Sequence, residues 1–147
     1  MLIKRFGDGD AKPRTWMIVL APGDEAKESL LRFARDQHVA SASFFALGAF
    51  ERAVVGYFQW DEKTYKPIPI TQQVEVLSLI GDIVPDESGP HVLHAHTVLG
   101  LSDGTTRGGH LLEGHVRPTL EITVTETPAH LVRRMRSDLG VALIDFG

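Results

Sequence analysis

The stretch from residue 40 to residue 126 constrains the fold most, because one β-strand pattern follows another with only short turn signals between them. These runs are rich in β-branched and aromatic residues, and Gly, Pro and Asp residues separate them. Strands that follow one another directly pair most simply as antiparallel neighbours. The predicted strands are Ala40–Phe45, Arg52–Trp60, Tyr65–Ile70, Gln73–Ile83, His91–Leu99 and Thr119–Thr125.

Two details of these strands bear on the architecture. Pro67 and Pro69 make Tyr65–Ile70 an edge strand, because proline cannot donate to a neighbouring strand. Strict alternation along Gln73–Ile83 places two sets of side chains on opposite faces. One face carries Val74, Val76, Ser78 and Ile80, and the other carries Glu75, Leu77 and Leu79.

The two ends of the chain contain helical signals. Thr15–Leu20 is predicted as a strand, and Asp24 is a candidate N-cap for a helix that follows Pro22-Gly23. A second helix is predicted from Thr127-Pro128 to about Gly140, with the basic run Arg133–Arg136 on its solvated face. The segment "VALIDF" then resembles a last short strand. The expected fold class is α+β: a single compact domain over residues 1–147, with a largely antiparallel sheet flanked by two main helices.

Composition narrows the classes of function. The chain has 147 residues, no cysteine, 43% hydrophobic residues and 23% charged residues, so a core can form without disulfides. Neither a signal peptide nor an apolar run long enough to cross a bilayer is apparent, and we expect a cytoplasmic protein with no membrane partner. The net charge of −4 and a pI of about 5.9 argue against a protein held on DNA by phosphate contacts.

The segment "HAHTVLGLSDGTTRGGH" carries three of the seven histidines. Alternation in a strand puts His94 and His96 on the same face. Asp103-Gly104 is a hairpin signal, and Gly108-Gly109 permits the close backbone approach that would bring His110 beside the pair.

Three neutral imidazoles with one open position are typical of a catalytic or ligand-binding zinc, and nitrogen ligands also suit nickel, copper or iron. The alternative is that the three histidines are partly exposed strand residues with no common role. His91 precedes His94 by three residues and therefore faces away, and His115 lies beyond Gly114. We expect neither His91 nor His115 to be a ligand.

The segment "HAHTVLGLSDGTTRGGHLLEG" resembles the signature of the PPC domain, the "plants and prokaryotes conserved" family. Prokaryotic members carry an H-x-H, a short acidic-glycine turn, and then G-G-H-L with a following Glu-Gly. The segments "LAPGDEAKESLLRFARDQHV", "SASFFALGAFERAVVGYF" and "VEVLSLIGDI" also resemble the family, so the similarity spans nearly the whole chain.

The resemblance implies a compact α+β domain that assembles as a homotrimer. It also implies that His94, His96 and His110 match the metal-ligand positions of the family. Apolar strand residues such as Leu77 and Leu79 would need cover, which agrees with a homotrimer. Plant members join the domain to AT-hooks, from which the label "DNA-binding" derives. This sequence contains no Arg-Gly-Arg-Pro hook, so we expect no nucleic-acid partner.

Two further residues are candidates for the site. Glu113 matches a position of the family motif. Near a metal it would act as general base for a bound water, or it would orient a ligand histidine. The alternative is that Glu113 is a surface carboxylate or forms an ion pair at a subunit interface. Arg107 is a candidate for binding an anionic small-molecule ligand.

Three hypotheses follow from these residues. The first is a trimeric protein that binds zinc, or another divalent transition metal, and whose open metal position holds a small ligand or water. The second is a metal-dependent hydrolase with Glu113 as base. The third is a DNA-binding regulator, which would need a basic patch built across the trimer.

Overall fold

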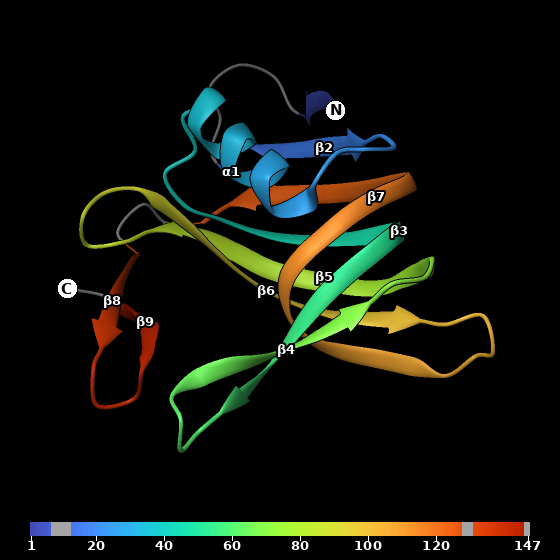
Figure 1. The fold of residues 1–147 in the computed structure, drawn as a ribbon. Coiled ribbons are helices and arrows are strands. Elements are labelled where there is room, and N and C mark those ends of the chain that lie inside the picture. Colours follow the sequence, from blue (N-terminus) through green and yellow to red (C-terminus); the bar gives the residue numbers. More distant parts are fainter. Residues whose placement is uncertain (7–12, 128–130, 146–147) are drawn as a thin grey trace.

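The computed structural model describes residues 1–6, 13–127 and 131–145. Seven strands form one antiparallel sheet in the order β1-β2-β7-β6-β5-β3-β4, and a separate pair, β8 and β9, forms a hairpin near the C-terminus (Figure 1). The strands of the large sheet are β1 (Leu2–Phe6), β2 (Thr15–Leu20), β3 (Ala42–Gln59), β4 (Thr64–Ile70), β5 (Val74–Pro85), β6 (His91–Gly100) and β7 (Thr106–Glu126). The predicted antiparallel sheet is confirmed.

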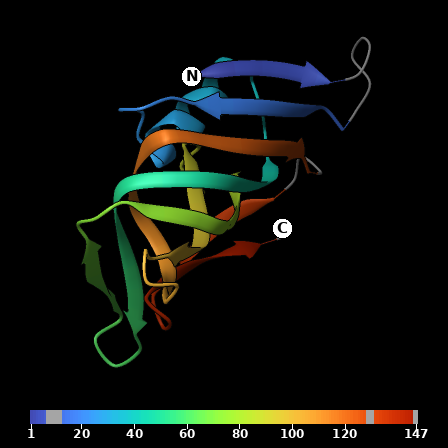
Figure 2. The same ribbon diagram turned by 90° about the vertical axis from the view of Figure 1, so that its right-hand side faces the viewer.

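The sheet closes on itself because β7 pairs with β3 as well as with β6. Strands β3, β5, β6 and β7 therefore form a ring of antiparallel pairs. Strand β3 continues past this ring to pair with β4, and the β3–β4 hairpin extends away from the ring (Figure 2). As predicted, the proline-containing β4 lies at an edge of the sheet.

The helix α1 (Ala26–Asp36) packs its apolar face onto the sheet. Leu30 and Phe33 are fully buried, and the ring of Phe33 meets that of Trp16 edge-to-face at 5.3 Å. The N-cap is Glu25 rather than the predicted Asp24, since the Glu25 carboxylate accepts from the backbone N–H of Glu28. Among the described residues, no helix combines the length and hydrophobicity needed to cross a membrane.

The second predicted helix is wrong. Residues 128–130 lie outside the described part of the chain, and the residues after them form β8 (Val132–Arg136) and β9 (Val141–Asp145), which pair antiparallel. The predicted last strand needs a partner, and β8 supplies it. A tertiary contact fixes β8 in place, because Arg133 is buried against Asp82 of β5. The basic run is thus part of a strand, and one of its arginines is buried.

The predicted alternation along β5 holds only for its first half. The register against β6 shifts between Val76 and Ser78, and this bulge exchanges the two faces. Leu79 is therefore fully buried, whereas Leu77 and Ile80 are exposed. Of the two leucines that the sequence predicts to need cover from another subunit, only Leu77 is exposed.

Strands β3 and β7 are longer than predicted. The two predicted strands Ala40–Phe45 and Arg52–Trp60 form one continuous strand, Ala42–Gln59, with a register shift at Gly48. A side chain at Gly48 would place its Cβ 2.3 Å from the carbonyl oxygen of Thr119, so the two strands approach closely there. Strand β7 likewise runs unbroken through the glycine pair that precedes His110.

Candidate metal centre

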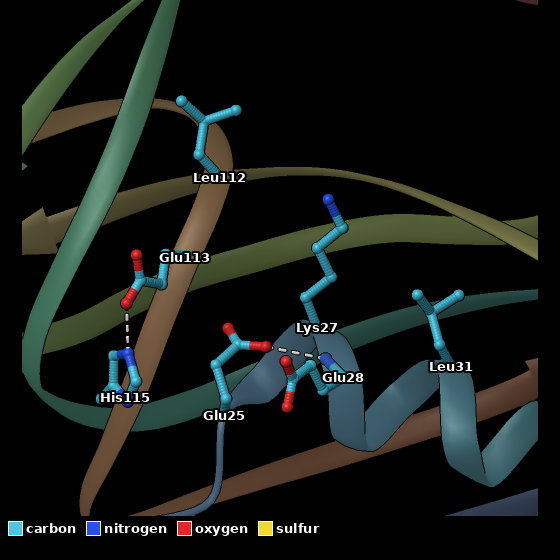
Figure 3. Close-up of a pocket in the computed structure, with 7 residues that line it drawn as sticks. All are labelled: Glu25, Lys27, Glu28, Leu31, Leu112, Glu113 and His115. Carbon is cyan, nitrogen blue, oxygen red and sulfur yellow. Dashed lines mark hydrogen bonds and ion pairs between the residues drawn. The ribbon is translucent and has the colours of Figure 1, made fainter.

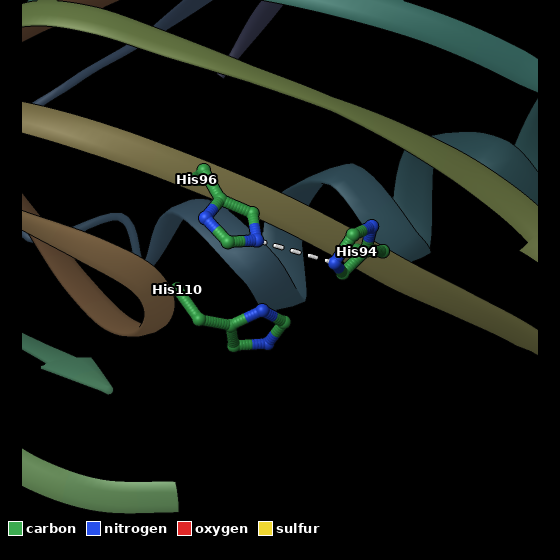
Figure 4. A group of neighbouring side chains, drawn as sticks. All are labelled: His94, His96 and His110. Carbon is green, nitrogen blue, oxygen red and sulfur yellow. Dashed lines mark hydrogen bonds between the residues drawn. The ribbon is translucent and has the colours of Figure 1, made fainter. Parts of the chain in front are cut away.

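His94, His96 and His110 form one cluster on the outer face of β6 and β7. One ring nitrogen from each lies within 4.8 Å of those of the other two. The Nε2 atoms of His94 and His96 are 3.3 Å apart, and the ring of His110 lies 5.2 Å and 5.4 Å from the rings of His94 and His96. Figure 4 shows the three rings converging from the two strands. The structure thus brings together the three predicted metal ligands.

Local sequence explains how the rings meet. His94 and His96 flank Ala95, which is fully buried, so both imidazoles point outward. The Asp103-Gly104 turn reverses the chain: the carboxylate of Asp103 accepts from the N–H of Thr105, and Gly104 has a φ of +81°. His110 then lies directly opposite His96 in the β6–β7 register.

The glycine pair allows this close approach, as the sequence predicts. A side chain at Gly108 would come within 2.7 Å of the carbonyl oxygen of Thr97 on β6. One at Gly109 would come within 2.7 Å of the carbonyl oxygen of Gly56 on β3. Strand β7 therefore fits between its two neighbours only with glycine at these positions.

The environment keeps two of the imidazoles neutral. Burial, together with the charges of His94 and His96 when they are protonated, lowers the pKa of His110 to about 4. The cations of Lys27 and Arg133 act in the same direction. Burial and then His94 lower the pKa of His96. Neutral imidazole is the form that coordinates a metal.

The group fits a tetrahedral metal ion. Two nitrogens bound to one such ion at roughly 2.0–2.1 Å lie roughly 3.3 Å apart, which matches the separation of the His94 and His96 Nε2 atoms. The Nδ1 of His110 is buried and has no hydrogen-bond partner among the described residues. A buried nitrogen of this kind normally has a partner, and a metal ion would provide one.

Asp82 and Arg133 support His94, and the sequence does not reveal either role. Asp82 lies opposite His94 in the β5–β6 register, with its carboxylate 3.8 Å from the Nδ1 of His94. Arg133 from β8 donates to both oxygens of that carboxylate at 2.8 Å. Burial acts to raise the pKa of Asp82, but the nearby His94 imidazole and the hydrogen-bonded Arg133 guanidinium outweigh it and hold the pKa below its usual value.

Tyr65 of β4 supports His110. Its ring stacks on that of His110 at 4.5 Å with an interplanar angle of 26°. The edge of Tyr65 also packs against the ring of Phe58. The only sequence signal for this contact is an aromatic residue beside two prolines, which does not indicate what lies beneath it.

Glu113 is oriented toward a different cavity from the cluster. It is hydrogen-bonded to the Nε2 of His115, and both residues line a cavity of about 410 Å³ beside the start of α1 (Figure 3). The remaining lining residues of this cavity are Glu25, Lys27, Glu28, Leu31 and Leu112.

Arg107 and His91 also lie apart from the cluster. Arg107 pairs with the buried Leu99 in the β6–β7 register, so it is on the face opposite to His110, and it lines a cavity of about 170 Å³ with residues 69–72 and Leu101. The Nε2 of His91 lies 3.2 Å from the carbonyl oxygen of Ala40.

Comparisons with known proteins agree with this fold. The model of the Plants and Prokaryotes Conserved (PCC) domain matches residues 8–128. A solved PPC protein from Pyrococcus horikoshii has a TM-score of 0.85 and 28% identity, over 98% of this chain and 94% of that one. A candidate DNA-binding protein from Ralstonia eutropha JMP134 has a TM-score of 0.82 and 31% identity, over 88% of this chain and 90% of that one.

Two further relatives are more distant or only partly covered. A metal-containing protein from Archaeoglobus fulgidus shares the fold, with a TM-score of 0.82 and 23% identity over 98% of each chain. The bifunctional protein GlmU of Synechococcus sp. is 29% identical over 116 residues, which are 78% of this chain but only 17% of that protein. The family match and the shared fold together lead to one conclusion: this chain belongs to the Plants and Prokaryotes Conserved domain family.

Proposed function

We propose that this protein binds a divalent transition metal through His94, His96 and His110, and that this metal is zinc. The observation that carries the proposal is the 3.3 Å separation of the His94 and His96 Nε2 atoms, which equals the ligand spacing of a tetrahedral site. The buried Nδ1 of His110, which has no hydrogen-bond partner in the described part of the chain, supports it. The Archaeoglobus fulgidus neighbour is described as metal-containing, which agrees with the proposal.

The carboxylate of Asp82 fits a second role at such a site. A metal-bound histidine commonly donates its other ring N–H to a carboxylate, which orients the ring and raises its basicity. Asp82 lies beside the Nδ1 of His94, and the Nε2 of His94 faces His96. The charge of Arg133 balances Asp82, so this carboxylate can remain ionised in a partly buried position.

Three protein ligands leave one position of a tetrahedral ion for water or a small ligand. We infer a ligand-binding or accessory role for this position rather than hydrolysis. A hydrolase would need a base near the metal-bound water, and the hydrogen bond of Glu113 goes to His115 in another cavity. No observation on the described residues favours Glu113 as that base.

We also propose a homotrimer. Phe45, Leu47, Leu77 and Val98 are apolar, 43–58% exposed, and all on the outer face of β3, β5 and β6. An apolar surface of this kind on neighbouring strands is typical of a protein interface. The candidate DNA-binding neighbour raises a third role for this chain, which the net charge of −4 disfavours.

The proposal is tested by titrating metal-free protein with Zn²⁺ and Co²⁺. We expect one ion per subunit for each metal. Cobalt should also give the intense visible absorption of a tetrahedral complex, and zinc should displace it. Weak binding without fixed stoichiometry, or cobalt spectra of six-coordinate type, would contradict a three-histidine site.

A further inference from the structure

A cavity of about 470 Å³ adjoins the histidine cluster. Its lining residues are Ser43, Phe44, Ile80, Gly81, Asp82, His94 and His96. Its size lies in the range of cavities that hold small molecules, which are roughly 300–1,000 Å³. A second cavity of about 260 Å³ lies on the other side of Ile80 and also reaches His96. A molecule in the larger cavity would therefore contact two of the three proposed ligands.

The strand register explains why apolar and metal-binding groups meet there. Across the sheet, Phe45 pairs with Ile80, Ile80 with His96, and His96 with His110. Residues paired in this way share a face, so two exposed apolar side chains continue the row that holds two of the histidines. Ile80 is 57% exposed, although isoleucine is among the residues most often buried.

The charge of the site distinguishes among ligands for this cavity. Three neutral imidazoles do not offset the charge of a divalent ion, so the loaded centre carries a net positive charge. The one carboxylate in the cavity wall, Asp82, is matched by the guanidinium of Arg133 at 2.8 Å. A negatively charged group next to the metal is therefore favoured, while the other walls are largely uncharged.

We propose that this site takes a small monocarboxylate, whose apolar body lies in the larger cavity against Ile80 and Phe44 and whose carboxylate completes the metal's coordination. The inference rests on the proposed zinc site. It assigns the specificity of the site to Ile80 and Ser43, which are exposed and are not metal ligands.

The test compares four probes by calorimetry on zinc-loaded protein: benzoate, acetate, benzamide and benzylammonium. Benzoate should bind more tightly than acetate by roughly tenfold or more, since ring burial adds to metal coordination. Benzamide and benzylammonium should bind more weakly than benzoate by at least a similar factor, because they lack the negative charge. Zinc-free protein should lose the preference for benzoate over benzamide and benzylammonium, because that preference depends on the charge of the metal.

Two pairs of variants locate the binding site. Ser43→Asp adds a negative charge to the larger cavity and should weaken benzoate binding by roughly tenfold. Ser43→Asn introduces a neutral side chain of the same size as Asp, and it should leave benzoate binding unchanged. Ile80→Ala should remove most of the preference for benzoate over acetate. Leu2→Ala changes an exposed apolar residue on β1 that lines neither cavity, and it should leave that preference unchanged. Sedimentation and zinc content establish that each variant retains its assembly and metal.

The outcomes separate this inference from the proposed function. If the protein takes up no zinc, the metal site itself is wrong. If zinc binds but benzoate and acetate have equal affinity, the apolar cavity does not contribute and the inference is overturned. Equal affinities for benzoate and benzamide, or benzoate binding that Ser43→Asp leaves unchanged, would overturn it as well.

Discussion

Arg133 contacts both carboxylate oxygens of Asp82 at 2.8 Å, and it thereby joins the C-terminal hairpin to the strand beside the histidine cluster. The side chain of Arg133 is only 6% exposed, whereas that of Asp82 is 25% exposed, so the guanidinium is the more shielded partner. The Nδ1 of His94 lies 3.8 Å from the same carboxylate. The hairpin therefore helps to orient His94, because Arg133 holds Asp82 in place.

Replacement of Asp82 by Asn should weaken zinc binding by roughly 10–100-fold, because the neutral amide no longer raises the basicity of His94. Competition against a chromophoric chelator measures this affinity. Asp36→Asn is the matched control, since Asp36 is an exposed carboxylate at the end of α1 and is not part of the cluster. Equal zinc affinity of the Asp82 variant and the control would show that Asp82 does not support the metal site.

The metal-free protein should lose stability as the pH falls from about 6.5 toward 4. The pKa of His110 is lowered to about 4 in the folded state, whereas the unfolded chain has the ordinary value near 6.5. Between these values the unfolded state binds the additional proton, so acid favours unfolding, and above pH 6.5 this contribution to the pH dependence vanishes. His96, whose pKa is also lowered, acts in the same direction.

Thermal unfolding in the presence of a chelator, followed at several pH values, measures this effect. His110→Ala should make the decline in Tm between pH 6.5 and 4 shallower than in the unchanged protein. His91→Ala is the control, because this histidine lies outside the cluster. The assignment to His110 fails if its variant and the control decline equally.

Leu47→Glu should dissociate the proposed trimer. Leu47 lies among the apolar residues of the outer face and is 58% exposed. A carboxylate at this position would have to be buried in the trimer interface, which is costly. Sedimentation at micromolar concentration should give a trimer for the unchanged protein and a monomer for this variant. Tyr57→Glu, at a 67% exposed position on the β3–β4 hairpin, should remain trimeric. A monomeric unchanged protein would contradict the proposal.

Specific DNA binding should be negligible at physiological salt. The chain has 19 acidic and 15 basic side chains, so phosphate contacts would be opposed by its overall charge. Fluorescence anisotropy with A·T-rich and mixed duplexes measures this directly. Nanomolar binding to either duplex at that salt would overturn the expectation.

The sequence predicts strands within six of the seven that form the large sheet, because alternation and turn residues are local properties; β1 (Leu2–Phe6) is not predicted. The sequence predicts the meeting of His94, His96 and His110 for the same reason: a hairpin signal lies between them. The bulge in β5 leaves no such signal, since both faces of Gln73–Ile83 carry apolar residues. A shift by one residue therefore looks equally plausible from the pattern alone.

The C-terminal hairpin escapes prediction because a distant contact fixes it. The segment around Arg133 fits a helix by its local pattern, and the contact with Asp82 is 51 residues away in sequence. The roles of Asp82 and Tyr65 escape for a similar reason, since each reaches its histidine only through the strand register. Glu113 and Arg107 are near the histidines in sequence, but the structure directs them to other cavities.

The most direct test of the metal site is the zinc content per subunit of single histidine variants. Metal analysis after gel filtration, with circular dichroism to verify folding, should give about one zinc per subunit for the unchanged protein. His94→Ala, His96→Ala and His110→Ala should each lose most of the zinc and remain folded, whereas His91→Ala should retain it. Full zinc occupancy in the three cluster variants, or equal loss in His91→Ala and His96→Ala, would contradict the three-histidine site.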